Sequence, residues 1–174
     1  MNTDPKSFAR FNRWANGRLH AACATLTPEA LSLKRNAFFG SIMGTLNHIL
    51  LVDILYRERL EGRKSRFKEL DETLHRDLHT LSQEQSQLDN YYVELLGNMT
   101  QETLSEKLRF NTLLDDAQSW EVDKDIYFAN LFQHQIHHRG QAHNMLSQAG
   151  IAPPPIGFIE YHVELGNVTE ATPK

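Results

Sequence analysis

An all-α fold built as a four-helix bundle is predicted by three features of the sequence. Apolar residues recur every three to four positions in four segments, residues 5–26, 41–60, 72–96 and 124–149, which is the spacing of helices that bury one face. Residues that typically start or end helices lie at the ends of these segments. The chain has 174 residues, 40% of them hydrophobic and 23% charged, which suits one domain of roughly 100–200 residues. A bundle is the economical way to bury four such faces.

The first two helices carry start signals and an apolar face. Asp4 is the expected N-cap of the first, with Pro5 in its first turn, and Ser41 is the expected N-cap of the second, with Gly62 just past its end. The predicted buried face of the first helix holds Phe8, Phe11, Ala15, Leu19 and Ala22. That of the second holds Thr45, His48, Leu51, Val52, Leu55 and the stem of Arg59.

The third and fourth helices show the same pattern. The fourth begins after Asp123 and ends at Gly150, and the prolines at 153–155 prevent it from continuing. The third has a seam with steps of three and four, typical of helix-on-helix packing: Leu78, Leu81, Gln85, Leu88, Tyr92 and Leu95.

The remaining segments are expected to join and cover the helices within a single domain, residues 1–165. In Thr100–Val122, the pieces LRFNTLL and SWEV flank Asp115 and Asp116 and predict a short hairpin. Residues 151–165 are expected to fold back over one end of the bundle. Residues 166–174 are expected to form a flexible C-terminal tail.

Composition excludes several classes of protein. Cys23 is the only cysteine, so no intrachain disulfide can form, which favours a reducing cytoplasm. The N-terminus lacks the apolar region of a secretory signal, and no apolar run approaches the about 20 residues of a membrane span. The net charge is −4, and the one basic stretch, residues 57–68, contains only one aromatic residue, Phe67. We therefore expect a cytoplasmic protein that binds neither nucleic acid nor membranes.

Three histidines lie on predicted core-facing stripes. His134 and His138 are four residues apart, so only about 40° separates them around the helix axis. Their face is apolar, and His48 lies within the apolar stripe of the second helix. Buried imidazoles are costly unless their ring nitrogens find partners, and a divalent metal satisfies several at once. The alternative is that these are hydrogen-bonded core histidines.

The other histidines are weaker candidates. His137 falls about 60° to one side of the ligand face, and His143 lies nearly opposite it. His75 and His79 are also four apart, but their polar neighbours favour a solvated helix flank. His20 and His162 have no partner at a useful spacing and are not expected to belong to the site.

With these residues in place, the sequence resembles the DinB-like (DinB/YfiT) family, whose members are regarded as metalloenzymes. The resemblance covers nearly the whole chain in order, through FNRWANGRL, GTLNHILLVD, HQIHHRGQAHNML and GIAPPPIGFIEY. It implies an up-down-down-up four-helix bundle, commonly a homodimer, with His48, His134 and His138 as metal ligands. The rest of the motif matches His137, Arg139, Gly140 and Gln141. The long connection that this course requires is expected at Gly62–Asp71.

The expected chemistry follows from an open metal site. Three protein ligands leave a coordination position for water, whose pKa falls to about 7, or for a thiol bound as thiolate. Zn or Ni is the favoured ion, with Fe also compatible. Some relatives in the broader superfamily resemble enzymes that use a low-molecular-weight thiol, so the resemblance implies either a hydrolase or a thiol-dependent S-transferase.

No general acid or base could be assigned, so the catalytic residues stay open. Tyr56 and Tyr127 lie about two turns from ligands, and Asp53 is on another face of its helix. Gln141 and Asn130 flank the ligand face and are candidates for orienting a ligand or water. Arg139 is expected to have a structural role, in packing or in an ion pair with another helix. Two alternatives to an enzyme remain: a non-catalytic metal- or ligand-binding bundle, and a partner-binding bundle whose histidines are incidental.

Overall fold

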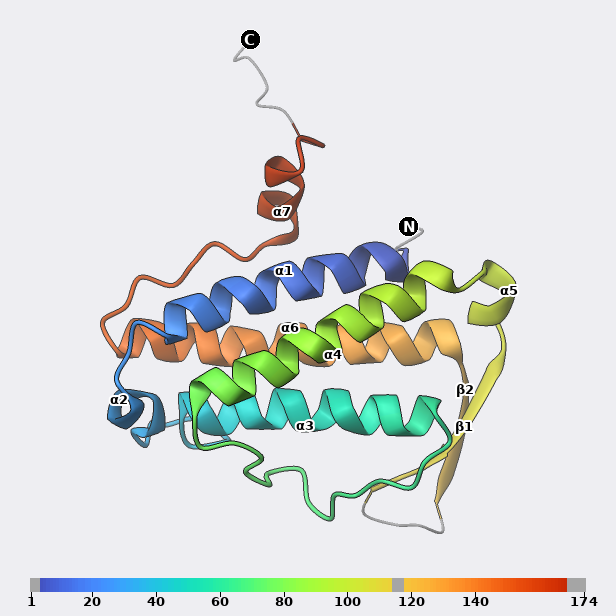
Figure 1. Cartoon of the computed structure of the whole chain (residues 1–174), viewed down its shortest axis with the longest axis horizontal. Coiled ribbons are helices and arrows are strands. Elements are labelled where there is room, and N and C mark those ends of the chain that lie inside the picture. Colours follow the sequence, from blue (N-terminus) through green and yellow to red (C-terminus); the bar gives the residue numbers. More distant parts are fainter. Residues whose placement is uncertain (1–3, 114–117, 169–174) are drawn as a thin grey trace.

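Four long helices contain most of the helical residues of the described chain. The computed structural model describes residues 4–113 and 118–168, and within them the chain is mostly helical. The long helices are α1 (Pro5–Cys23), α3 (Ile42–Leu60), α4 (Leu78–Asn98) and α6 (Lys124–Gln148). They lie alongside one another, and the chain runs in one direction in α1 and α6 and in the opposite direction in α3 and α4 (Figure 1).

The helix starts follow the capping residues of the sequence. The side chain of Asp4 accepts a hydrogen bond from the backbone of the first turn of α1, and that of Ser41 does the same for α3. Gly150 has a positive φ of 78° just past α6, as expected for a residue that ends a helix. The first helix ends at Cys23, three residues earlier than predicted, because Thr27 caps a separate short helix, α2 (Pro28–Ser32).

The predicted start of the third helix at residue 72 is wrong. Helix α4 starts at Leu78, where Asp77 is the N-cap and accepts from the backbone N–H of Thr80 at 2.8 Å. The preceding backbone is held elsewhere, because Asn47 on α3 accepts hydrogen bonds from the N–H groups of Leu74 and His75, both at 2.8 Å. Six residues that were expected to be helical therefore extend the connection between α3 and α4.

This connection covers residues 61–77 and returns along α3 to the end where that helix began (Figure 1). It is longer than the expected Gly62–Asp71. Such a length allows α4 to run parallel to α3 rather than antiparallel, since a short loop joins only antiparallel neighbours. It also places backbone carbonyls beside α3.

The predicted hairpin is present between α4 and α6. Strands β1 (Lys107–Asn111) and β2 (Ser119–Asp123) pair antiparallel, with Leu108 opposite Val122, and a one-turn helix α5 (Gln101–Leu104) precedes them. Asp115 and Asp116, around which the hairpin was expected, lie outside the described residues. Partly buried Leu108, Phe110 and Val122 pack against the main core, which supplies the support that two strands alone would lack.

The C-terminal segment lies against the side of α1 rather than over one end of the helices. After the prolines it runs back beside α1 and forms α7 (Phe158–Glu164), whose Tyr161 packs against Phe11 and Ala15 (Figure 1). The indole N–H of Trp14 donates to Glu164 at 2.7 Å. Of the predicted tail, residues 169–174 lie outside the described residues.

Helix α3 is the central helix of the core. It buries 15 of its 19 residues, and the polar side chains of Asn47, His48 and Asp53 are among them. A helix in that position must give each buried polar group a partner. Within residues 4–113 and 118–168, no helix has the length and hydropathy needed to cross a membrane.

Candidate metal centre

The three predicted ligands come together between α3 and α6. His48, His134 and His138 each offer a ring nitrogen, and these nitrogens all lie within 4.8 Å of one another. The Nε2 atoms of His48 and His134 are 2.9 Å apart, and the ring centroids of His134 and His138 are separated by 4.3 Å. Residues 86 positions apart thus share one point inside the protein, as the sequence predicted.

The connection between α3 and α4 fixes the orientation of His48. Its Nδ1–H donates to the backbone carbonyl of Leu70 at 2.7 Å. Because a carbonyl can only accept, the lone pair of a neutral His48 must be on Nε2, the atom that faces the other histidines. Asn47 supports this contact, since it binds the backbone at Leu74 and His75 and so holds the connection against α3. No residue pattern could have identified Leu70, because every residue has a backbone carbonyl.

Gln141 fixes His138 in the same way. The Nδ1–H of His138 donates to the amide oxygen of Gln141 at 2.9 Å, which leaves the lone pair on Nε2. The amide nitrogen of Gln141 donates to His137, which is exposed and one turn away. The predicted orienting role of Gln141 is therefore seen in the structure, and His137 belongs to its surroundings.

Phe39 covers the histidines on one side. Its ring stacks on His48 with centroids 3.9 Å apart and an interplanar angle of 19°, and it meets His138 edge-on at 5.4 Å. Phe39 lies in the loop before α3, a position that no helical spacing could have identified. An apolar ring against two imidazoles lowers the local polarity and excludes water from that side.

All three imidazoles are biased toward their neutral, metal-binding form. Burial lowers the pKa of His48 to about 4 and that of His134 to about 3, with further lowering from the neighbouring histidines. Burial also lowers the pKa of His138. Neutral rings at pH 7 carry the lone pairs that a metal requires.

The lone pairs favour a cation over hydrogen bonding among the rings. With Nδ1 of both rings donating, the Nε2 atoms of His48 and His138 are acceptors, and the Nε2 of His134 can supply at most one proton. One hydrogen bond would satisfy one of the two acceptors, whereas a divalent ion would bind the Nε2 atoms of all three rings. The Nδ1 of His134 is buried without a hydrogen-bond partner in either case. Tetrahedral ligands about 2.05 Å from a metal lie about 3.3 Å apart, so the 2.9 Å pair needs to spread by only a few tenths of an ångström. These residues fit a metal ion.

Two buried polar residues anchor α6 behind the ligands. Gln135 follows His134 and donates to the carboxylate of Asp53 on α3. Arg139 follows His138, is only 2% exposed, and donates to the side-chain oxygens of two asparagines on α1, Asn12 at 2.7 Å and Asn16 at 2.8 Å. These bonds restrict the rotation of α6 and so hold its imidazoles toward α3. Arg139 thus has a structural role, as expected, through hydrogen bonds to another helix.

Asp53 and Asp89 complete this buried polar group. Burial raises the pKa of Asp53 well above its ordinary value, and the nearby carboxyl of Asp89 adds to the rise. Burial also raises the pKa of Asp89 to about 6, against the opposing effect of Asn16 and Arg139. Asp53 faces Gln85 and Gln135 rather than the three histidines, so it does not serve the site as a base.

The other polar candidates are occupied by structural contacts. The hydroxyl of Tyr127 donates to the backbone carbonyl of Tyr56, and the side-chain amide of Asn130 bonds the hydroxyl of Tyr56. Asn130 therefore touches Tyr56 and not a ligand histidine. Asp71, which the sequence did not single out, acts electrostatically on His48 and is a carboxylate beside the site.

The remaining histidines lie away from the centre. His20 is buried and bonds Ser82 at 2.7 Å, whereas His79 is exposed. His75 is half-buried and bonds Glu84 at 2.5 Å, so it is less solvated than expected. His143 bonds the backbone of Pro154.

The protein is thus mostly helical, and two adjacent helices direct three imidazoles to one candidate metal site. The chain belongs to the DinB family, whose model matches residues 1–167. Its structure is similar to the crystal structure of a DinB-like protein from Bacillus cereus ATCC 10987, with a TM-score of 0.63 and 20% sequence identity. The match covers 85% of this chain and 94% of that chain. At 20% identity it supports only the similarity of the fold. No curated protein matched the sequence.

Proposed function

We propose that this protein is a metal-dependent enzyme built on an up-down-down-up four-helix bundle, in which His48, His134 and His138 hold one divalent ion. The observation that carries the proposal is the convergence of two oriented Nε2 lone pairs on a third, half-buried imidazole. The opposite chain directions of α1 with α6 and α3 with α4 support the bundle (Figure 1). Zn or Ni is the expected ion, with Fe also compatible with imidazole ligands.

The chemistry follows from a three-ligand set. A divalent ion bound by three side chains acts as a Lewis acid on a substrate oxygen or sulfur at its open position. This suits a hydrolase or a thiol-dependent S-transferase. The protein contributes fixed imidazole orientations through Leu70 and Gln141, and the ring of Phe39 excludes water from one side. The charge of the Asp71 carboxylate also acts on His48 and raises its pKa, against the larger effect of burial.

Metal analysis tests the site. Protein purified without a histidine tag is expected to carry close to one metal ion per chain, and His134→Ala is expected to abolish that metal, because the remaining two imidazoles bind weakly. His79→Ala, which alters an exposed histidine, is the matched control and should keep full occupancy. Equal metal content in both variants would refute the ligand assignment.

Turnover separates the enzyme from the second candidate, a metal-binding bundle without catalysis. Low-molecular-weight thiols and generic ester or amide substrates should be added to the metal-loaded protein. A change in the absorbance of a cobalt-substituted site with a thiol shows that the thiol binds, and release of product supports the enzyme. Absence of both responses with all of these substrates favours the binding protein.

We further propose that the protein is cytoplasmic and forms a homodimer. Light scattering of the purified protein would test the homodimer.

A further inference from the structure

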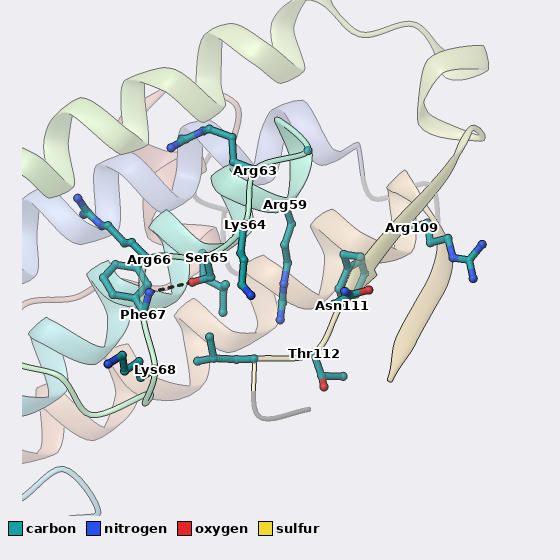
Figure 2. Close-up of a pocket in the computed structure, with 14 residues that line it drawn as sticks. Arg59, Arg63, Lys64, Ser65, Arg66, Phe67, Lys68, Arg109, Asn111 and Thr112 are labelled. Atoms are coloured by element: carbon teal, nitrogen blue, oxygen red, sulfur yellow. Dashed lines mark hydrogen bonds between the residues drawn. The ribbon is translucent and has the colours of Figure 1, made fainter. Parts of the chain in front are cut away.

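A basic cavity lies farther along α3 than the candidate metal centre. It occupies about 870 Å³ between the end of α3, the connection that follows and strand β1 (Figure 2). Its basic side chains are Arg59, Arg63, Lys64, Arg66, Lys68 and Arg109. No carboxylate lines it among the described residues. Leu55, Phe67 and Phe110 add apolar walls.

The arginines of this cavity differ in their partners. Arg63 pairs with Glu58 and Glu61, and Arg66 lies near Glu58 and Glu84. Both extend away from the centre of the cavity, toward α4, whereas Arg59 extends from α3 into the space facing β1 (Figure 2). Arg63 and Arg66 are therefore balanced by carboxylates outside the cavity.

Arg59 has no carboxylate partner in the described part of the chain. Its guanidinium lies 4.6 Å from the ring centroid of Phe110 and 5.8 Å from that of Tyr56, and its Nε is buried without a hydrogen-bond partner. Arg59 also interacts with the hydroxyl of Tyr127. Stacking on rings holds a guanidinium flat and leaves the rest of its N–H edge available. A planar, partly dehydrated guanidinium is suited to bind a carboxylate or phosphate.

The cavity shares a helix face with the histidine site. Leu55 is seven residues after His48 and Arg59 eleven, so each lies within about 20° of His48 around the axis of α3. Along the axis they lie about 10 Å and about 16 Å from it. The connection also joins the two regions, since Lys68 lines the cavity and Leu70 orients His48.

We propose that the basic cavity binds a small organic anion, a phosphate or carboxylate on an apolar body, with Arg59 as its anchor. The anion would be the far end of the substrate whose reactive end lies at the three histidines. This second statement rests on the proposed function, whereas binding in the cavity does not. The apolar body packs on Phe67 and Phe110, and the oxyanion meets the edge of Arg59.

The test measures binding of phenyl phosphate, benzoate and inorganic phosphate by calorimetry, with neutral benzyl alcohol for comparison. Wild-type protein should bind the aromatic anions. Arg59→Met should lower their affinity about 10–100-fold, which corresponds to the loss of a charge-assisted hydrogen bond. The matched control is Arg57→Met. Arg57 is on the same helix and also lies over an aromatic ring, Tyr91, but does not line the cavity. Its loss should change affinity less than about twofold, since it makes no contact with the ligand.

His134→Ala separates the cavity from the metal. This variant should bind the anions as wild type does, and loss of binding there with retention in Arg59→Met would overturn the proposal. Absence of aromatic-anion binding to wild type, or equal losses in Arg57→Met and Arg59→Met, would also overturn it. If Arg59→Met does not fold, Arg59→Lys decides, because it keeps the charge but loses the planar fork and should still bind severalfold more weakly.

Cobalt-loaded protein tests the link to the histidine site. Relaxation of the phosphorus nucleus of bound phenyl phosphate should place it about 10–16 Å from the cobalt, the spacing along α3. Direct coordination, at about 3–4 Å, would show that the anion prefers the metal and would overturn the assignment to the cavity. A wild-type protein that takes up no cobalt would refute the proposed function. The anion affinities of Arg59→Met and Arg57→Met would still test whether the cavity binds the anion.

Discussion

The buried histidine outside the candidate site, His20, offers a quantitative test of the structure. It lies on α1, bonds the hydroxyl of Ser82 at 2.7 Å, and burial lowers its pKa from 6.5 to about 4. In the unfolded chain its pKa returns to about 6.5. Between these values the unfolded state binds a proton that the folded state does not, so stability falls as the pH decreases through this window.

The magnitude follows from the two pKa values. At pH 5, His20 destabilises the protein by about 2 kcal/mol relative to pH 7.5, and the full loss, below pH 4, is about 3.4 kcal/mol. In His20→Gln the amide can still bond Ser82 but cannot take up a proton. The variant should therefore lose about 2 kcal/mol less stability than wild type between pH 7.5 and pH 5.

Urea unfolding of chelator-treated wild type, His20→Gln and His79→Gln at both pH values would measure this. The other titrating groups, including Asp53 and Asp89, contribute equally to all three proteins and cancel in the comparison. His79 is exposed, so its variant should follow wild type. If His20→Gln and wild type lose the same free energy to within about 0.5 kcal/mol, the burial of a neutral His20 is wrong.

Three further predictions concern the site and its support. Metal should stay bound when the pH is lowered through 6, because burial lowers the pKa of all three ligand histidines, that of His48 to about 4, and so weakens the competition from protons. Metal analysis after dialysis at stepped pH would show this, and half-loss above pH 6 would contradict it. In the same urea assay, Arg139→Met should lower the free energy of unfolding by about 3–5 kcal/mol, because it leaves buried polar partners unpaired. The control Arg10→Met, at an exposed position, should change the free energy of unfolding by less than about 0.5 kcal/mol. Phe39→Ala should reduce metal affinity about 10-fold or more through loss of the ring that covers the ligands, and unchanged affinity in a competition titration would show that the ring has no role in binding.

The sequence determined the long helices and the ligand candidates because both depend on local spacing. A four-residue separation puts His134 and His138 on one face whatever surrounds the helix, and the apolar stripe around His48 marks the buried face of α3. Capping residues such as Asp4 and Ser41 act within one turn, so their positions predicted the helix starts.

Tertiary structure decided the features that depend on residues far apart in the chain. The start of α4 moved from residue 72 to Leu78 because Asn47, on another helix, binds the backbone at Leu74 and His75. The orientation of His48 depends on a backbone carbonyl that no residue type signals. The basic cavity likewise forms only where residues 59–68 meet strand β1. Local spacing fixes which face a side chain occupies, whereas its partners are set by how the helices pack.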